Sequence, residues 1–281
     1  MRNTTLVILA AGLGSRYGGD KQIAGVGPAD ETLLEFTLFD ALRSGITSAI
    51  AVVRPSVAER VAALLSRAPG LKWTLVEQPS HRPRPWGTAH ALYCAMETVD
   101  APVVVVNADD WYGPGAMAKA VELLDNGADL ALTAHQLGRT LSHHGPVNRG
   151  VCRISHGQLT AIEEVIGIVP DPAGARYPGG LLSADVPVSL NLWSLTAAVK
   201  PFLAQQVNDF LATHRDDPKG EIYIPDVVAS WIASGRKVRS EVCHEDWCGL
   251  THLADRPQVV SRLAQATAAG VYPSPLWIKI S

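Results

Sequence analysis

The stretch TTLVILAAGLGSRYGGDKQ, residues 4–22, decides the fold class of this chain. Residues 4–10 form an apolar run that predicts a buried β-strand. Residues 11–22 combine four glycines with one arginine and one lysine. In open α/β sheets, loops at the carboxyl ends of the strands bind ligands, and glycine-rich backbone can approach a phosphate closely. We therefore expect an α/β fold with an anion-binding loop after its first strand.

Strand and helix patterns alternate over the first half of the chain. Expected strands cover 49–53, 72–78, 102–108 and 128–135, and expected helices cover 31–44, 56–66, 87–99 and 114–126. The short connections predict a Rossmann-like α/β/α sandwich around a mainly parallel mixed sheet. Three polar segments then fall at one edge of that sheet: residues 9–22, the segment around Gln78, and NADDWYG at 107–113.

The second half of the chain has a different pattern. Strands are expected around 150–193, interrupted by a long loop at 169–185 that is rich in Gly, Pro and Ala. Helices at about 195–213 and 225–234, a strand at 237–243 and a helix near 256–269 follow. No linker or internal repeat separates the halves, so we expect one domain over 1–281 whose second half forms the far wall of a cleft.

Composition excludes several classes of protein. A formal net charge of -3 over 281 residues gives no basic field for nucleic acid. The apolar runs are too short to span a bilayer, and no signal segment precedes the first strand. Four scattered cysteines favour a reduced, cytoplasmic chain. Cys243, His244 and Cys248 lack the second ligand pair of a zinc site.

Two common phosphate-binding loops do not fit residues 9–22. In the dinucleotide fingerprint G-x-G-x-x-G, the third glycine would stand one residue before Gly18. In the Walker loop, the lysine follows a glycine and precedes Ser or Thr, whereas Lys21 stands between Asp20 and Gln22. A third possibility is a backbone wrap around a triphosphate, with Arg16 and Lys21 neutralising its charge.

This stretch resembles the opening motif L-x-x-G-x-G-[ST]-R, with a nearby lysine, of the sugar-phosphate nucleotidyltransferases. These enzymes couple a nucleoside triphosphate to a sugar phosphate and release pyrophosphate. The resemblance extends from residue 5 to about 265 and implies a GT-A-like fold of the nucleotide-diphospho-sugar transferase type. It implies a nucleotide-binding half at 1–135 and a sugar-phosphate-binding half at 136–281. It gives catalytic roles to Arg16 and Lys21, and nucleotide binding to Leu9, Ala11, Gly12, Gly14 and Ser15.

Two further segments resemble that family's nucleotide and metal motifs. EQPSHRPRPWGTAHAL, residues 77–92, resembles the base-reading segment and implies nucleotide-binding roles for Gln78, Gly87 and Thr88. VVVVNADDWYG, residues 103–113, resembles the strand end whose first aspartate binds Mg²⁺, here Asp109. The family's second metal ligand aligns with Gly249, so we expect Asp246 to supply that carboxylate instead.

The sugar-side motifs match less closely. RGVCRI implies a substrate-binding role for Gly150, LTAIEEV implies one for Glu163 or Glu164, and VSLNLW implies one for Asn191. Val165 stands where many family members carry a phosphate-binding lysine.

The expected activity is nucleotidyl transfer from a nucleoside triphosphate to a sugar-1-phosphate with Mg²⁺. A phosphate dianion needs no general base, which suits a sequence without an obvious catalytic histidine. The short RYGGDK loop keeps open a molybdenum-cofactor-type or other small-molecule nucleotidyltransferase. Val165 and Gly249 keep open a non-catalytic, nucleotide-sensing homologue. The apolar tail at 271–281 is expected to dock on the body or on a second subunit of a homo-oligomer.

Overall fold

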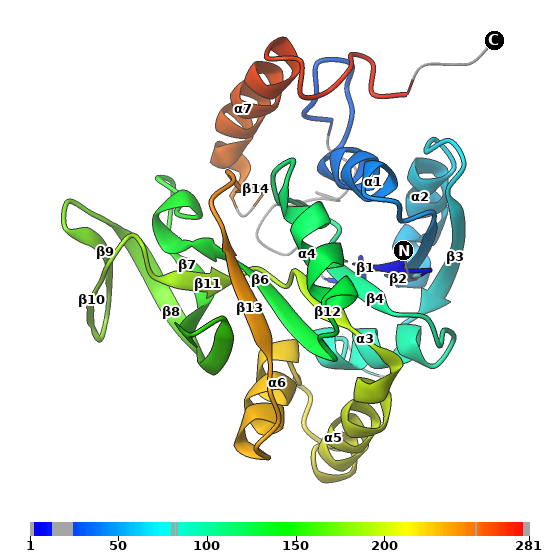
Figure 1. Ribbon diagram of the computed structural model, residues 1–281, viewed down its shortest axis with the longest axis vertical. Helices are drawn as coiled ribbons and strands as arrows, with labels where there is room; N and C mark the ends of the chain where they lie inside the picture. Colours follow the sequence, from blue (N-terminus) through cyan, green and yellow to red (C-terminus); the bar gives the residue numbers. More distant parts are fainter. Residues whose placement is uncertain (1–2, 13–24, 80–81, 83, 251, 278–281) are drawn as a thin grey trace.

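A twelve-stranded mixed sheet runs through the computed structural model, which describes residues 3–12, 25–79, 82, 84–250 and 252–277 (Figure 1). Its order is β10-β9-β8-β7-β11-β6-β12-β4-β1-β2-β3, and β13 pairs with β6 and β8. The strands of both halves of the chain therefore share one sheet. This mixed sheet, covered by helices on two faces, confirms the expected α/β sandwich.

The first half of the chain supplies the parallel part of the sheet. Its parallel strands are β1 (Thr5–Leu9), β2 (Ser48–Val53), β3 (Lys72–Glu77) and β4 (Val103–Asn107). Its helices are α1 (Leu33–Arg43), α2 (Pro55–Leu65), α3 (Thr88–Met96) and α4 (Ala116–Asp125). The strands alternate their side chains between two apolar layers, because successive residues point to opposite faces. Leu6 and Ile8 pack beneath α1, α2 and α4, whereas Val7 and Leu9 pack against α3.

The second half extends the sheet mainly with antiparallel strands. These are β6 (Leu130–Gln136), β7 (Val147–Ser155), β8 (Gln158–Asp171), β11 (Pro187–Ser189) and β12 (Trp193–Leu195). β13 (Arg239–Cys243) returns parallel to β6. Helices α5 (Lys200–Thr213) and α6 (Ile224–Ala233) join α3 on the face that carries Val7 and Leu9. Parallel pairing is thus confined to the first half and to β13.

The expectation of a long loop at 169–185 is wrong. β8 runs to Asp171 and is followed by β9 (Gly174–Tyr177) and β10 (Gly180–Leu182), which pair antiparallel. Figure 1 shows this hairpin projecting from the far end of the sheet. Pro172, Pro178 and Gly179 lie in the turns between these strands, and Gly174 and Gly180, which begin β9 and β10, have φ of +132° and +140°, a region open to glycine. The strand expected after that loop, up to about residue 193, is also broken, since Asn191 has φ of +64° between β11 and β12.

The C-terminal segment packs on the body. α7 (Arg256–Ala268) and the following residues bury Leu263, Tyr272 and Leu276 against Leu33 and Phe36. The Tyr272 hydroxyl donates to Asp40 on α1 at 2.9 Å and accepts from Trp111 Nε1 at 2.8 Å. A two-stranded sheet, β5 (Asp110–Trp111) with β14 (Cys248–Gly249), lies beside this contact. Among the described residues, no helix is long and apolar enough to cross a membrane.

Candidate active site

A cavity of about 430 Å³ opens at the carboxyl end of β4 and is closed on its far side by β7, β8 and α6. Five of the residues that the motifs single out line it: Thr88, Asp109, Gly150, Glu164 and Asn191. They come from five separate segments of the chain. The two that are farthest apart in sequence, Thr88 and Asn191, are separated by 103 positions. Further lining residues that carried no expectation of a role are Asn107, Asn148, Arg149, Ser189, Tyr223 and Asp226.

A hydrogen-bonded chain of polar side chains crosses the floor of the cavity. Trp193 Nε1 donates to Asn191 Oδ1 at 3.2 Å, and Asn191 Nδ2 donates to Asn107 Oδ1 at 3.3 Å. Asn107 Nδ2 in turn donates to Asp110 Oδ2 at 2.7 Å. A short bond to an ionised acceptor is among the stronger hydrogen bonds in proteins. This series of hydrogen bonds fixes the orientation of Asp110 relative to Asn191.

The two consecutive aspartates differ in their surroundings. Asp109 is half-buried in the turn after β4, while Asp110 is buried and its backbone carbonyl accepts from Thr37 Oγ1 at 2.9 Å. Tyr112 donates its hydroxyl hydrogen to Leu190 O at 3.0 Å, and burial raises the pKa of this phenol well above its usual value. Both carboxylates lie at the cavity, where oxygen ligands for a hard cation would be needed.

Asp246 lies away from these two aspartates. Its carboxylate pairs with Arg139 Nη1 at 2.9 Å and with Arg262 Nε at 3.9 Å, and it is not among the cavity-lining residues. The residue opposite Asp110 is Gly249, its partner in β14. A Cβ atom on Gly249 would lie 2.7 Å from Asp110 Oδ1. Position 249, which aligns with the family's second metal ligand, therefore lies next to the carboxylate of Asp110. Metal binding by Asp246 stays a prediction.

The start of the glycine-rich loop is held by neighbouring strands. Leu9 O accepts from Ala108 N at 3.1 Å, Ala11 is buried, and Gly12 O accepts from Arg54 Nη2 at 3.4 Å. These contacts place the end of β1 beside the Asp109 turn. The remaining loop residues with expected roles, Gly14, Ser15, Arg16 and Lys21, lie outside the described residues.

Gln78 and the start of α3 form one hydrogen-bonded unit. Gln78 Nε2 contacts Gly87 O at 3.0 Å and His90 Nδ1 at 3.1 Å, and the glutamine is only 3% exposed. Burial lowers the pKa of His90 to about 4, so its ring is neutral at pH 7 and can accept this bond. Thr88 Oγ1 accepts from Ile224 N at 3.1 Å. Both amide hydrogens of Gln78 are thus used internally, and neither Gln78 nor Gly87 is among the residues that line the large cavity.

Strand geometry separates the two candidate glutamates on β8. Glu164 lines the cavity opposite Gly150, and burial raises the pKa of its carboxyl. Both glutamates are exposed, but Glu163 is not among the lining residues, because neighbouring strand residues point to opposite faces. Val165 is buried in an apolar cluster with Val147 and Ile168, and its cross-strand partner is Arg149. Glu164 is therefore the better placed of the two.

Comparisons with solved structures agree with the fold of the chain. A putatively assigned glucose-1-phosphate thymidylyltransferase from Bacillus anthracis, solved with sucrose, superposes with a TM-score of 0.67 at 15% identity. The inositol-1-phosphate CTP transferase from T. maritima superposes with a TM-score of 0.65 at 13% identity. Each match covers 92% of this chain and 95% of the other. At these identities the likeness shows the fold.

The sequence itself identifies the family. No curated protein matches the chain. The family model for the MobA-like NTP transferase domain matches residues 6–207, which is more than half of the chain and includes the glycine-rich loop, the Asp109 turn and Asn191. The chain therefore belongs to the family of MobA-like NTP transferase domains and is a nucleotidyltransferase of that family.

Proposed function

We propose that this chain transfers a nucleoside monophosphate from a nucleoside triphosphate to a sugar-1-phosphate and releases pyrophosphate. The observation that carries the proposal is the cavity beside Asp109 and Asp110, whose other wall bears Glu164 and Asn191. A carboxylate and a carboxamide can accept from and donate to neighbouring hydroxyl groups, which suits a polyol. The cavity volume of about 430 Å³ lies within the usual range for small-molecule sites.

The donor set fits a divalent cation that is shared with the substrate. Mg²⁺ is typically held by one or two carboxylates plus substrate phosphates and water. Asp109 and Asp110 offer two carboxylates, and the described part of the chain contains no group of three or more His, Cys, Asp or Glu side chains that could hold a metal. When bound there, the cation would neutralise charge on the triphosphate and polarise it.

The chain's own groups position the reactants. Asn107 links Asp110 to Asn191 through its hydrogen bonds, and Glu164 would accept from acceptor hydroxyls. In the proposal, Arg16 and Lys21 bind the triphosphate and stabilise the leaving pyrophosphate. The acceptor phosphate is already a nucleophile at neutral pH, so orientation and charge stabilisation are the main tasks.

A molybdenum-cofactor-type acceptor is the second candidate. The name of the matching family model and the short spacing between Arg16 and Lys21 favour it. Against it stand β7 and β8, which give the cavity its second wall and its glutamate.

Pyrophosphate release from a panel of nucleoside triphosphates with sugar-1-phosphates, inositol-1-phosphate and nucleotide alone tests the proposal. We expect Mg²⁺-dependent release with one sugar-1-phosphate. Release only with a non-sugar acceptor would contradict the sugar assignment. Binding of nucleotide without turnover of any acceptor would contradict transferase activity and indicate a sensing homologue.

Asp109→Asn tests the cation site. We expect kcat/KM to fall at least about 100-fold, because the variant replaces a carboxylate ligand with a neutral amide. Asp125→Asn, at the exposed end of α4, is the matched control and should keep the wild-type rate. A wild-type rate in Asp109→Asn would refute the assignment of Asp109 to the metal.

A further inference from the structure

Arg149 is a buried cation that contacts only neutral groups. Its side chain lies on β7, and the residue is 8% exposed. Nε donates to Thr140 Oγ1 at 3.1 Å, Nη1 donates to Asn148 O at 2.9 Å, and Nη2 donates to Thr140 O. Within the described ranges of the chain, no carboxylate forms an ion pair with it. Three of its five N–H groups are used in this way, so two remain.

Such a buried charge is costly without a partner. An ionised group taken out of water is normally paired or coordinated. Burial lowers the pKa of Arg149 to about 10, so the guanidinium stays charged at neutral pH. The carboxylates of Asp110, Glu164 and Asp255 favour the charged form from a longer distance. The protein therefore keeps a buried positive charge on Arg149, although desolvation of the charge is unfavourable. Two N–H groups of this guanidinium have no partner in the hydrogen bonds given above.

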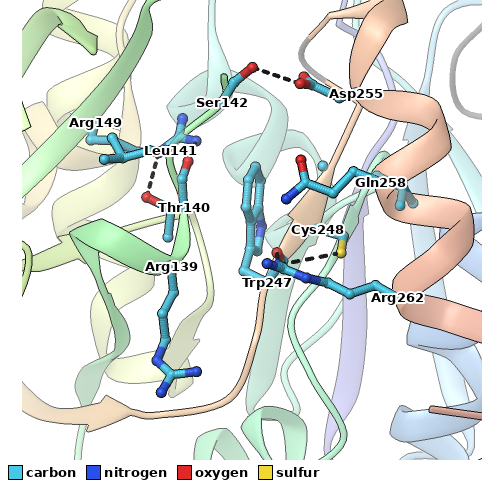
Figure 2. Close-up of a pocket in the computed structure, with 12 residues that line it drawn as sticks. Arg139, Thr140, Leu141, Ser142, Arg149, Trp247, Cys248, Asp255, Gln258 and Arg262 are labelled. Atoms are coloured by element: carbon cyan, nitrogen blue, oxygen red, sulfur yellow. Dashed lines mark hydrogen bonds between the residues drawn. The ribbon is translucent and has the colours of Figure 1, made fainter. Parts of the chain in front are cut away.

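The guanidinium lies in a wall between two cavities. Arg149 and Trp247 line both the large cavity and a smaller one of about 30 Å³, whose lining residues Figure 2 shows. The centre of the Arg149 guanidinium lies 4.9 Å from the centroid of the Trp247 ring. A guanidinium over an aromatic ring keeps a fixed plane and presents its N–H groups at the edge. Figure 2 also shows the hydrogen bond between Arg149 and Thr140.

The position of Arg149 along the cavity indicates which anion it would meet. Asp110, on the proposed metal side, and Glu164, on the proposed polyol side, are the two carboxylates with the strongest electrostatic effect on it. A phosphorylated polyol whose hydroxyls reach Glu164 and whose phosphate faces the triphosphate has its phosphate between these two residues. We propose that Arg149 is the acceptor-binding residue that recognises the phosphate group of the acceptor. This inference rests on the proposed transfer to a phosphorylated acceptor.

Kinetics of three variants test the inference. Arg149→Met should raise KM for the sugar-1-phosphate about 10- to 100-fold and change KM for the nucleoside triphosphate less than about threefold, since one charge-assisted contact is lost. Arg149→Lys keeps the charge and should recover part of the loss. Arg153→Met, at an exposed position of the same strand, is the matched control and should leave both KM values unchanged. Equal KM values for the acceptor in Arg149→Met and wild type would overturn the inference.

Direct anion binding keeps the test independent of turnover and of the stability of the variants. In the wild-type chain, inorganic phosphate should bind and raise the Tm, and Arg149→Lys should weaken both effects. A crystal of the wild-type chain grown with inorganic phosphate should show the ion on the guanidinium of Arg149. Phosphate bound in the cavity but not on Arg149 would overturn the inference. A wild-type chain that binds phosphate at Arg149 yet turns over no acceptor would refute the proposed function while supporting this role.

Discussion

At the scale of single residues, Asn107 connects the proposed metal side of the cavity to its acceptor side. Its amide donates to Asp110 Oδ2 at 2.7 Å and accepts from Asn191 at 3.3 Å. Its backbone N–H donates to the Tyr112 hydroxyl at 2.8 Å. Only a side chain with both a donor and an acceptor can link a carboxylate and a carboxamide in this way. Its position at the last residue of a buried strand, before two aspartates, was a signal that sequence reasoning missed.

Asn107→Ala should separate these two sides of the site. We expect a free energy of unfolding lower by about 1–2 kcal/mol and kcat lower by about 10-fold or more, because a hydrogen bond to a charged group is lost. Asn107→Asp should be worse than Asn107→Ala, since a second carboxylate would repel Asp110. Steady-state kinetics and thermal unfolding check this, with Asn208→Ala on the exposed face of α5 as control. Equal kcat in wild type and Asn107→Ala would contradict the linking role.

At the scale of elements, the start of α3 is bound to the segment before α6. Gly87 has φ of +93°, and a Cβ atom there would lie 2.3 Å from Ile222 O. Ala89 N donates to that same carbonyl at 3.1 Å, and Ile222 N donates to Trp86 O at 2.9 Å. The glycine thus permits both the left-handed backbone and the close approach of two chain segments that lie 135 residues apart between Gly87 and Ile222. This junction supports Gln78 and Thr88.

Gly87→Ala should therefore reduce stability by more than the left-handed backbone conformation of an alanine would by itself. We expect about 3 kcal/mol or more of lost stability and weaker nucleotide binding. The matched control is Gly127→Ala, where φ is +82° but no atom lies within 4 Å of the added Cβ. That control should lose only about 1 kcal/mol, the cost of left-handed backbone. Chemical denaturation measures both, and equal losses would show that the contact with Ile222 has no energetic role.

Sequence patterns predicted the elements of the first half better than those of the second. Helical periodicity places α1 and α4 correctly to within about two residues, because each buries one apolar stripe on the sheet. The β9–β10 hairpin was missed because its strands are short and its turns contain the Gly and Pro residues that usually mark loops. Arg149 could not be found from sequence, since its burial depends on Thr140 and Trp247, which other segments supply.

At the scale of the whole molecule, two neutral histidines lie in the core. His90 lies on α3 and His135 on β6, and both are nearly inaccessible to solvent. His135 Nε2 lies 2.9 Å from Tyr112 O. Burial lowers the pKa of both rings, to about 4 for His90. The folded chain therefore resists protonation at pH values where the unfolded chain, with ordinary histidines near 6.5, takes up protons.

This difference predicts that the contribution of the two histidines to stability decreases as pH falls from 6.5 towards 4. In that window each of these two histidines binds more proton in the unfolded state than in the folded state, so its contribution to the free energy of unfolding rises with pH, by up to about 1.4 kcal/mol per pH unit. Asp40, whose pKa burial raises to about 8, contributes a slope of the opposite sign. His90→Gln should flatten the slope and, at pH 4.5, reduce the acid loss by about 2 kcal/mol. His244→Gln, at an exposed position, should leave the slope unchanged. Denaturant unfolding from pH 4.5 to 7.5 measures the slopes; parallel curves for wild type and His90→Gln would show that His90 is protonated alike in both states.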